Sequence, residues 1–248
     1  MRGYRRDLAF IHDAGFSGYA LGAAPGLLRI LKTHKITRGL VVDLGCGSGR
    51  WARELNRAGY DALGVDQSRA MIALPRRIAP KSRFKVASLL RTALPRCDAI
   101  TSIGECVNYR FDRATNNRSL MRLFKRAYGA LRPDGILVCD FATPKRSPDG
   151  SAREHRSYGR GWKIVAKTIA YETRGIRREI VAFRRVGGAW RRSDETHDLR
   201  LYSAAEISGK LKRCGFRVRV VRGYGRFRFP RGIEGVVAVK PEFQGRRR

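Results

Sequence analysis

The chain has 248 residues, of which 43% are hydrophobic, so it can bury the core of an α/β domain and is not disordered throughout. Its 53 Lys and Arg against 21 Asp and Glu give a formal net charge of +32, which raises nucleic acid or another polyanion as a partner. The basic residues are spread along the chain and not gathered in one dense block, and an arginine-rich solvated surface explains the same charge.

The cysteine pattern and the apolar runs indicate a reduced, cytoplasmic protein. Five cysteines are scattered without a CxxC pair, which argues against a disulfide framework and against a structural zinc site. No apolar run has the length of a membrane span, and the N-terminus lacks the core of a signal peptide. We therefore expect no metal ion and no membrane partner.

The predicted elements begin with helices and continue as alternating strands and helices. Residues 4–36 have the apolar clustering of helices, with a break near residues 22–26, and we predict a helical cap over residues 1–38. Within residues 39–142, five apolar runs predict strands: "LVVDLG", "ALGVD", "FKVASL", "DAITSIG" and "GILVCDFA". Helical stretches lie between several of them, at residues 50–58, 69–76 and 119–131. This alternation predicts a parallel sheet covered by helices on both faces.

The rhythm changes after residue 142. Residues 143–160 are polar and contain several Pro and Gly, which predicts a loop, and three strand-like runs follow with turn signals between them. We predict an inserted antiparallel three-stranded meander within residues 143–202. Residues 203–241 then predict a helix and two strands that return to the first sheet and bring it to seven strands, and residues 242–248 form a basic tail.

The stretch "VVDLGCGSGR", residues 41–50, ends a predicted strand in a glycine-rich turn that opens a helix. Glycines let backbone amides approach a ligand, and the helix N-terminus adds a positive dipole end. Asp66, at the end of the second predicted strand, can accept hydrogen bonds from both hydroxyls of a ribose. The dinucleotide fingerprint G-x-G-x-x-G requires a glycine at position 50, where this chain has Arg50, so the spacing favours another nucleoside-bearing ligand.

With this glycine spacing and its two acids, "VVDLGCGSGRWARELNRAGYDALGVDQS" closely resembles the first two motifs of the class I S-adenosylmethionine-dependent methyltransferases. "LRPDGILVCDF" and the C-terminal helix and strands resemble later parts of the same family, so the likeness extends over most of residues 39–240. The resemblance implies the fold of that family, an α/β, doubly wound, mostly parallel Rossmann-like sheet. It also implies S-adenosylmethionine (SAM) as the cofactor.

The resemblance further implies which residues bind the cofactor. The glycine turn would wrap the methionine part of SAM, Asp66 would hold the ribose, and Gln67 would border the adenine. Ser88 and Leu89 would line the other face of the adenine, and Ser88 stands where many members of the family have Asp. The full set of expected cofactor residues is Asp43, Gly45, Cys46, Gly47, Gly49, Asp66, Gln67, Ser88, Leu89, Ile103 and Gly104.

The methyl acceptor is expected next to the end of the fourth strand, because ligands of such sheets bind outside the carboxyl ends of the strands. This end is "SIGECVNYR", residues 102–110, whose GE-x-x-NY pattern resembles a group of bacterial methyltransferases. We expect Glu105, Asn108 and Tyr109 to face the acceptor. Glu105 either orients or deprotonates an amine or hydroxyl, pairs with cationic groups of the cofactor, or caps the following segment. Tyr109 either contacts the acceptor or packs in the core.

His197, in the run "DETHDLRLY" of the predicted meander, is a third candidate for catalysis. In small-molecule methyltransferases, inserted strands at this place commonly form a lid over the acceptor, and a histidine with an ordinary pKa titrates near neutral pH. The alternative is a strand-edge histidine that is hydrogen-bonded to its neighbours. Near the N-terminus, Tyr4, His12 and Tyr19 are candidates for capping the cofactor cleft.

These patterns favour an enzyme that transfers a methyl group from SAM to a nitrogen or oxygen of a small molecule by in-line displacement. A second hypothesis, an RNA methyltransferase acting on rRNA or tRNA, rests on the net charge. Against it, the chain lacks an Asn/Asp-Pro-Pro-aromatic motif after the fourth strand and a Pro-Cys pair. A third hypothesis is a protein of the same fold that binds RNA without catalysis.

Overall fold

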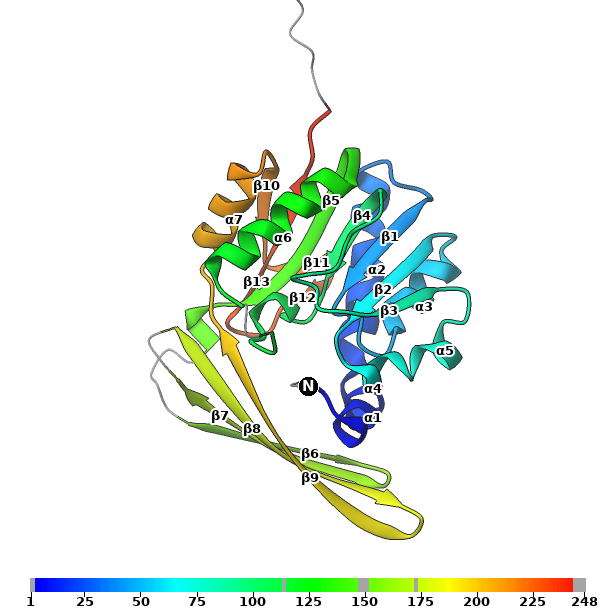
Figure 1. Ribbon diagram of the computed structural model, residues 1–248, viewed down its shortest axis with the longest axis vertical. Coiled ribbons are helices and arrows are strands. Elements are labelled where there is room, and N and C mark those ends of the chain that lie inside the picture. The colour runs from blue at the N-terminus through cyan, green and yellow to red at the C-terminus, as the bar shows by residue number, and fades with distance from the viewer. Residues whose placement is uncertain (1–2, 113–114, 147–151, 172–173, 243–248) are drawn as a thin grey trace, which may run out of the picture.

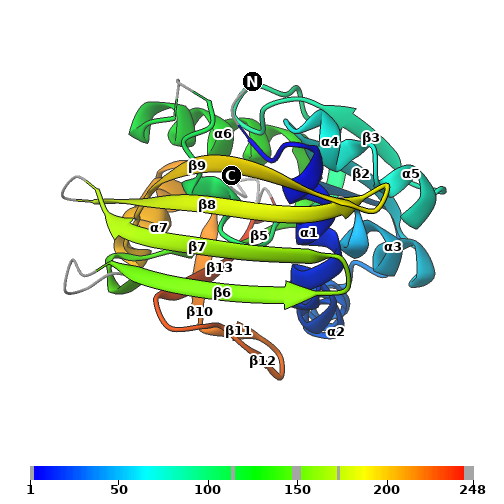
Figure 2. The same ribbon diagram turned by 90° about the horizontal axis from the view of Figure 1, so that it is seen from below.

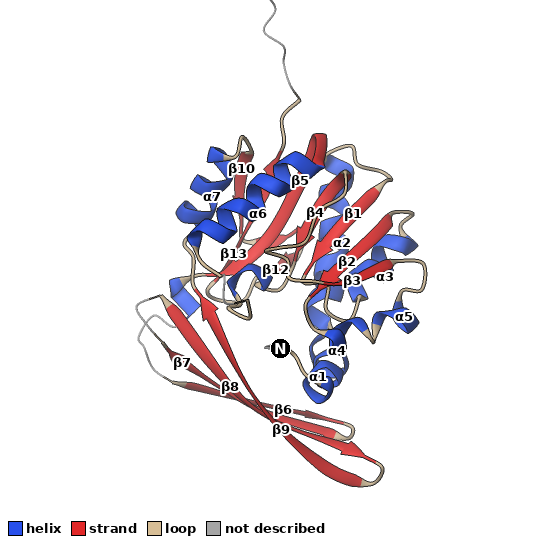
Figure 3. Ribbon diagram, viewed as in Figure 1, coloured by secondary structure: helices blue, strands red, loops and turns tan. Residues whose placement is uncertain are grey.

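The computed structural model describes residues 3–112, 115–146, 152–171 and 174–242, which form two main β-sheets and the helices around them (Figure 1, Figure 3). In Figure 1 the larger sheet lies between its helices, and the smaller sheet lies below it. Residues 243–248 of the predicted basic tail lie outside the described residues. Within the described ranges, every helix is too short or too polar to cross a membrane.

The larger sheet has seven strands in the order β10-β13-β5-β4-β1-β2-β3. Neighbouring strands pair in parallel except β13, which runs antiparallel to both β5 and β10. The strands are β1 (Leu40–Leu44), β2 (Asp61–Asp66), β3 (Arg83–Val86), β4 (Cys97–Ser102), β5 (Leu131–Ala142), β10 (Arg217–Val221) and β13 (Ile233–Val239). The prediction of an α/β, mostly parallel seven-stranded sheet is confirmed.

Helices cover both faces of this sheet, because successive residues of a strand point to opposite sides. The helices are α1 (Arg6–Phe16), α2 (Gly18–Thr33), α3 (Arg50–Arg57), α4 (Arg69–Ile72), α5 (Pro75–Ile78), α6 (Asn117–Ala130) and α7 (Ala204–Arg213), with the 3-10 helices η1 (Cys106–Asn108) and η2 (Pro144–Arg146). Val42 and Ile100 share an apolar cluster with α6 and α7, whereas Val41 and Ala99 share one with α2 and α3. The helix predicted over residues 69–76 is divided into α4 and α5.

The smaller sheet, called the insert sheet below, lies in the chain between β5 and α7 and has four antiparallel strands in the order β6-β7-β8-β9. They are β6 (Arg153–Gly159), β7 (Trp162–Ala170), β8 (Gly175–Val186) and β9 (Ala189–Arg200). Its inner face packs on α1, where Leu8 and Ile11 share an apolar cluster with Trp162, Ile164 and Ile180. Figure 2 shows the insert sheet from its outer face, with α1 behind it.

The predicted three-stranded meander is wrong in its number of strands, because residues 153–159 form β6 and not a loop. Each residue of β6 pairs with β7, from Arg153 with Thr168 to Gly159 with Trp162. The strand lies at the edge of the insert sheet and is mostly exposed, so "REHRSYG" lacks the apolar alternation of a half-buried strand.

The helical cap is divided at Ser17, between α1 and α2, and not near residues 22–26 as predicted. A Cβ at Gly26 would lie 2.0 Å from the carbonyl oxygen of Tyr224, so the helix needs a glycine where it meets this backbone. Tyr224 belongs to a small hairpin of β11 (Gly223–Tyr224) and β12 (Phe227–Arg228). The glycine that the sequence presents as a helix breaker thus serves close packing.

We predict that Gly26→Ala destabilises the fold, since the added methyl group overlaps the backbone of Tyr224. Overpacking of this kind costs about 1–3 kcal/mol in the free energy of unfolding, which urea denaturation measures. Gly129→Ala in α6 is the control, because a Cβ there meets no protein atom within 4 Å. The control is expected to be neutral or stabilising by up to about 1 kcal/mol. Equal changes in the free energy of unfolding for the two variants would contradict the close packing of α2 against the hairpin.

Candidate active site

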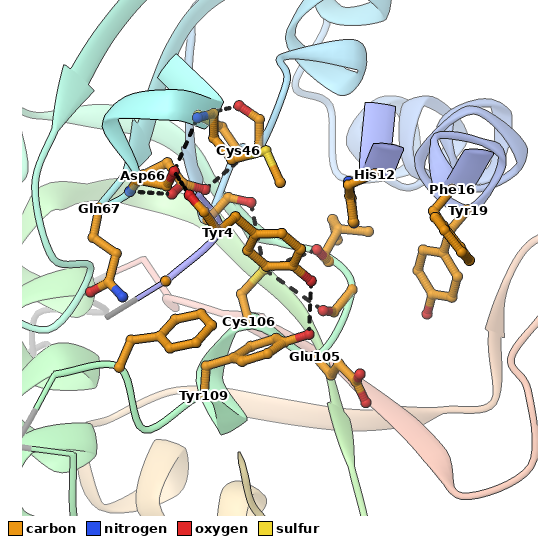
Figure 4. A pocket seen from close by; sticks show the side chains of 18 of the residues that line it. Tyr4, His12, Phe16, Tyr19, Cys46, Asp66, Gln67, Glu105, Cys106 and Tyr109 are labelled. Carbon is orange, nitrogen blue, oxygen red and sulfur yellow. Dashed lines mark hydrogen bonds between the residues drawn. The ribbon is translucent and has the colours of Figure 1, made fainter. Parts of the chain in front are cut away.

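A cavity of about 400 Å³ lies at the carboxyl ends of β1, β2 and β4, between the large sheet, α1 and the insert sheet (Figure 4). Its volume is in the range of pockets for drug-sized ligands, about 300–1,000 Å³. The structure brings most of the predicted site residues to its wall. Those that line it are Asp43, Gly45, Cys46, Gly47, Asp66, Gln67, Ser88, Leu89, Ile103, Gly104, Glu105 and Tyr109. Gly49 and His197 are not among the lining residues.

The glycine turn between β1 and α3 depends on glycine for its backbone. Gly45, Gly47 and Gly49 have φ angles of 81°, 53° and 76°, in the left-handed region that disfavours side chains. A Cβ at Gly47 would meet no protein atom within 4 Å, so the space beside it is left open. The carboxylate of Asp66 accepts hydrogen bonds from the N–H of Gly47 (3.0 Å) and the N–H of Ser68 (2.8 Å). The end of β2 thereby holds the turn at the end of β1.

Two buried carboxyl groups lie beside this turn. Burial raises the pKa of Asp66, although hydrogen bonds from the backbone lower it in part. Burial also raises the pKa of Asp43, to about 7. Thr101 donates a hydrogen bond to Oδ1 of Asp43 (2.8 Å), and the indole of Trp51 donates to the hydroxyl of Thr101 (3.1 Å). A cationic ligand in the cavity would favour the charged form of both carboxyl groups.

The turn after β4 is held by a carboxylate that was missed in the sequence. Asp140, near the end of β5, accepts hydrogen bonds from the N–H groups of Gly104 (2.8 Å) and Glu105 (2.6 Å). Its other oxygen accepts from the hydroxyls of Tyr19 (3.2 Å) and Tyr224 (3.1 Å). Asp140 is fully buried, and burial raises its pKa to about 6. The signal for this role was an acid near the end of the apolar run "GILVCDFA". Such an acid is expected to be buried, and a buried carboxylate requires several hydrogen-bond donors.

Glu105 is joined to the insert sheet by an ion pair. Its backbone is left-handed, with φ of 54°, and its Oε1 lies 2.6 Å from Nη1 of Arg178 in β8. The two side chains are only 12% and 15% exposed. The same guanidinium donates to the hydroxyl of Tyr109 (3.1 Å), which lies 3.1 Å from the hydroxyl of Tyr4 (Figure 4 shows the two tyrosines together). Arg178 was also missed in the sequence, because one arginine among so many carries no signal.

His197 lies behind the wall of the cavity and not on it. Its side chain is buried, and its Nε2 lies 3.0 Å from Oε2 of Glu195. Tyr4 and Phe111 line the cavity and pack edge-on against the ring of His197, with centroids 4.9 and 4.7 Å away. The geometry is that of a histidine bonded to its strand neighbour, the alternative considered above. His12 of α1 lines the cavity instead, and burial lowers its pKa to about 4, so its ring is uncharged at neutral pH.

Asn108 does not line the cavity, although its place in the chain led us to expect it there. Its side chain is fully buried, and its amide nitrogen donates to the carbonyl groups of Ala142 (2.9 Å) and Arg200 (2.6 Å). Its oxygen accepts from the N–H of Ala142 (2.9 Å). These bonds fasten η1 to the ends of β5 and β9, so Asn108 joins the insert sheet to the core.

At the expected adenine end of the cavity, Ser88 donates a hydrogen bond to Oδ2 of Asp112 (2.9 Å), and both residues line the wall. Arg91 holds the same carboxylate with bonds of 2.8 and 2.7 Å. Asp112 therefore brings an acid to the side of Ser88, the position at which many class I methyltransferases have Asp. It was missed in the sequence because it follows a different strand.

Comparisons with known proteins agree with this geometry. The methyltransferase domain family matches residues 41–135. YqeM of Bacillus subtilis (strain 168), whose name assigns it to the methyltransferases, is 25% identical over 74% of this chain and 76% of its own length. An S-adenosylmethionine-dependent methyltransferase from Clostridium acetobutylicum superposes with a TM-score of 0.80 over 94% of this chain and 98% of its own, at 18% identity. The sugar N-methyltransferase KedS8 from Streptoalloteichus superposes with a TM-score of 0.76 over 98% of this chain and 95% of its own, at 21% identity.

A methyltransferase domain occupies residues 41–135, and the fold is that of the class I SAM-dependent methyltransferases. The solved structures establish the fold, and the matched domain contains both the glycine turn and Asp66 at the spacing of that class. The protein is therefore an enzyme, and its methyl donor is SAM.

We predict that Asp140 makes the stability of the fold depend on pH. Its folded pKa of about 6 lies above the unfolded value of about 3.9, so the folded chain binds this proton more tightly. The resulting stability is fully present below about pH 4 and is lost as the pH rises through 6, a change of about 3 kcal/mol.

Urea denaturation between about pH 4 and 7 measures this change. The stability of the wild type should fall relative to that of Asp140→Asn as the pH rises, whereas Asp194→Asn, which changes an exposed carboxylate, should follow the wild type. Parallel pH profiles of the wild type and Asp140→Asn would show that Asp140 titrates alike in the folded and unfolded chain.

Proposed function

We propose that this enzyme methylates an amine or hydroxyl of a small molecule that enters the cavity between the large sheet and the insert sheet. The ion pair of Glu105 and Arg178 carries the proposal. Glu105 follows β4 of the large sheet and Arg178 belongs to the insert sheet, and both line the same cavity as the glycine turn. Apolar side chains of Leu8, Phe16 and Ile180 line the same cavity and exclude water from reacting groups. The fold shared with KedS8, a sugar N-methyltransferase by name, supports a small acceptor.

The residues present fit the cofactor. Gly47 and Gly104 line the cavity with left-handed backbones, and a Cβ at either would meet no protein atom within 4 Å, so the backbone there is clear for a ligand. The turn over residues 45–49 would hold the methionine part of SAM, and Asp66 would hold the ribose. Ser88 and Asp112 would take the adenine edge, where a carboxylate accepts a hydrogen bond from the exocyclic amine.

When bound, SAM supplies a methyl group already activated on a sulfonium, so the protein has to align the acceptor and receive a proton. Arg178 fixes Oε1 of Glu105, whereas Oε2 is buried without a hydrogen-bond partner among the described residues. A buried acceptor atom without a partner is costly, and an N–H or O–H of the acceptor molecule would satisfy it. Glu105 would thus orient the nucleophile, and Tyr109 would extend this polar wall.

Methyl-labelled SAM, incubated with the enzyme and either a small-metabolite extract or total RNA, tests the proposal. We expect label in the small-molecule fraction, because α1 and the insert sheet close over the cavity. Label confined to RNA would overturn the proposal in favour of an RNA methyltransferase. Cofactor binding with no label in either fraction would favour the non-catalytic hypothesis.

Replacement of Glu105 is predicted to separate catalysis from cofactor binding. Glu105→Gln keeps the shape of the side chain but weakens the acceptor for the nucleophile's proton, so we expect kcat to fall by about 10²-fold. The dissociation constant of SAM, measured by calorimetry, should change less than about threefold. Glu179→Gln is the control, since Glu179 is exposed and next to Arg178 in β8. Unchanged turnover in Glu105→Gln would remove Glu105 from the chemistry.

A side chain at Gly47 is predicted to block the cofactor. Gly47→Val would fill the open space beside the turn, so the affinity for SAM should fall at least about tenfold. Gly59→Val is matched for backbone strain, because Gly59 also has a left-handed φ, of 87°, but does not line the cavity. Calorimetry with both variants distinguishes a blocked site from a strained fold. Equal losses of affinity would place the cofactor elsewhere.

A further inference from the structure

Two of the long segments without an acidic residue lie next to each other in the fold of this strongly basic chain. Residues 14–42 hold four Lys and Arg, and residues 207–233 hold nine, without a single Asp or Glu in either segment. Residues 67–97 also hold eight Lys and Arg without an acidic residue, so a lack of acids is shared with other parts of the chain. The distinctive feature of residues 14–42 and 207–233 is therefore their contact in the fold, which brings their basic side chains together.

The fold brings the two segments side by side. α2 belongs to the first and β10 with the β11–β12 hairpin to the second, and Figure 2 shows α2 and the hairpin along the same edge of the molecule. Arg29 of α2 and His34, which follows the last residue of α2, line a small pocket together with Arg219 of β10 and Gly225 of the hairpin. On β10, Arg217 and Arg219 share the face that turns toward α2, because Val221, on that face, packs in the cluster of α2.

We name six exposed side chains of these segments the basic surface: Arg29, Lys32, Arg217, Arg219, Arg222 and Arg226. Among the described residues, none of the six forms an ion pair, whereas other arginines, such as Arg50 with Asp13 and Arg177 with Asp198, are paired. Burial, and then the charge of Arg219, lower the pKa of His34. The positive potential here is thus uncompensated, and a polyanion would relieve it.

The side chains favour nucleic acid over an anionic membrane. Five of the six are arginines, whose guanidinium groups bind phosphate in a bidentate manner. Binding to a membrane surface usually adds an apolar face that enters the lipid. Of the large exposed hydrophobic residues described, only Val220 lies on these elements, and it points to the opposite face of β10 from Arg219.

We propose that the basic surface binds the phosphate backbone of nucleic acid without reading its sequence. None of its six residues lines the cavity, so the surface is separate from the site of methyl transfer. The proposal therefore stands whether the acceptor is a small molecule or RNA.

The test compares two variants of equal net charge. One carries R29Q, R219Q, R222Q and R226Q in the basic surface, and the matched control carries R96Q, R118Q, R122Q and R160Q, which are also exposed but lie elsewhere. Fluorescence anisotropy measures binding of a labelled RNA and a labelled DNA duplex, each about 20 nucleotides long, over a range of salt concentrations. Sedimentation with phosphatidylserine vesicles measures membrane binding, and calorimetry with SAM shows that both variants are folded.

We expect the first variant to lose at least about tenfold in affinity for nucleic acid at about 0.15 M salt, with a salt slope lower by about 3, as for four lost phosphate contacts. The control should stay within about threefold of the wild type. Equal losses in both variants would show that the charge acts diffusely and overturn the proposal. Binding to vesicles but not to nucleic acid, or to neither, would also overturn it.

Discussion

Asp140 places one buried carboxylate where four hydrogen-bond donors meet, from the turn after β4, from α2 and from β11. A carboxylate without water is costly, and only several donors at once offset that cost, so these elements are held in one arrangement. The left-handed backbone of Glu105 is held by this anchor. The cavity wall after β4 and the packing of the hairpin against α2 therefore both depend on the carboxylate of Asp140.

The insert sheet completes what the large sheet leaves open. A parallel sheet ends in a row of turns at its carboxyl edge, and a dry site there needs a cover from another part of the chain. The insert sheet supplies that cover through Arg178, paired with Glu105, and through its apolar contact with α1. Asp7 of α1 also pairs with Arg184 and Arg191 of the insert sheet, so α1 and the sheet form one cover.

The net charge is unevenly balanced across the molecule. Where an acid lies nearby in the fold, an ion pair reduces repulsion locally, as for Arg91 with Asp112 at the expected adenine end of the cavity. Along α2, β10 and the hairpin there is no such balance, and like charges held together destabilise the folded state. A partner that supplies negative charge would explain this excess of basic residues, and we propose that it binds at the basic surface.

The sequence by itself determined the class of fold and the glycine turn between β1 and α3. Local patterns carried this information: the alternation of strands and helices, the glycines of residues 45–49, and Asp66. Such patterns can be recognised in a single sequence. Only the tertiary structure decided the fourth strand of the insert sheet, the anchoring role of Asp140, the pairing of Glu105 with Arg178 and the withdrawal of His197 from the cavity. Each of these features depends on contacts between residues that are far apart in the chain. Composition and motif spacing carry no information on such contacts.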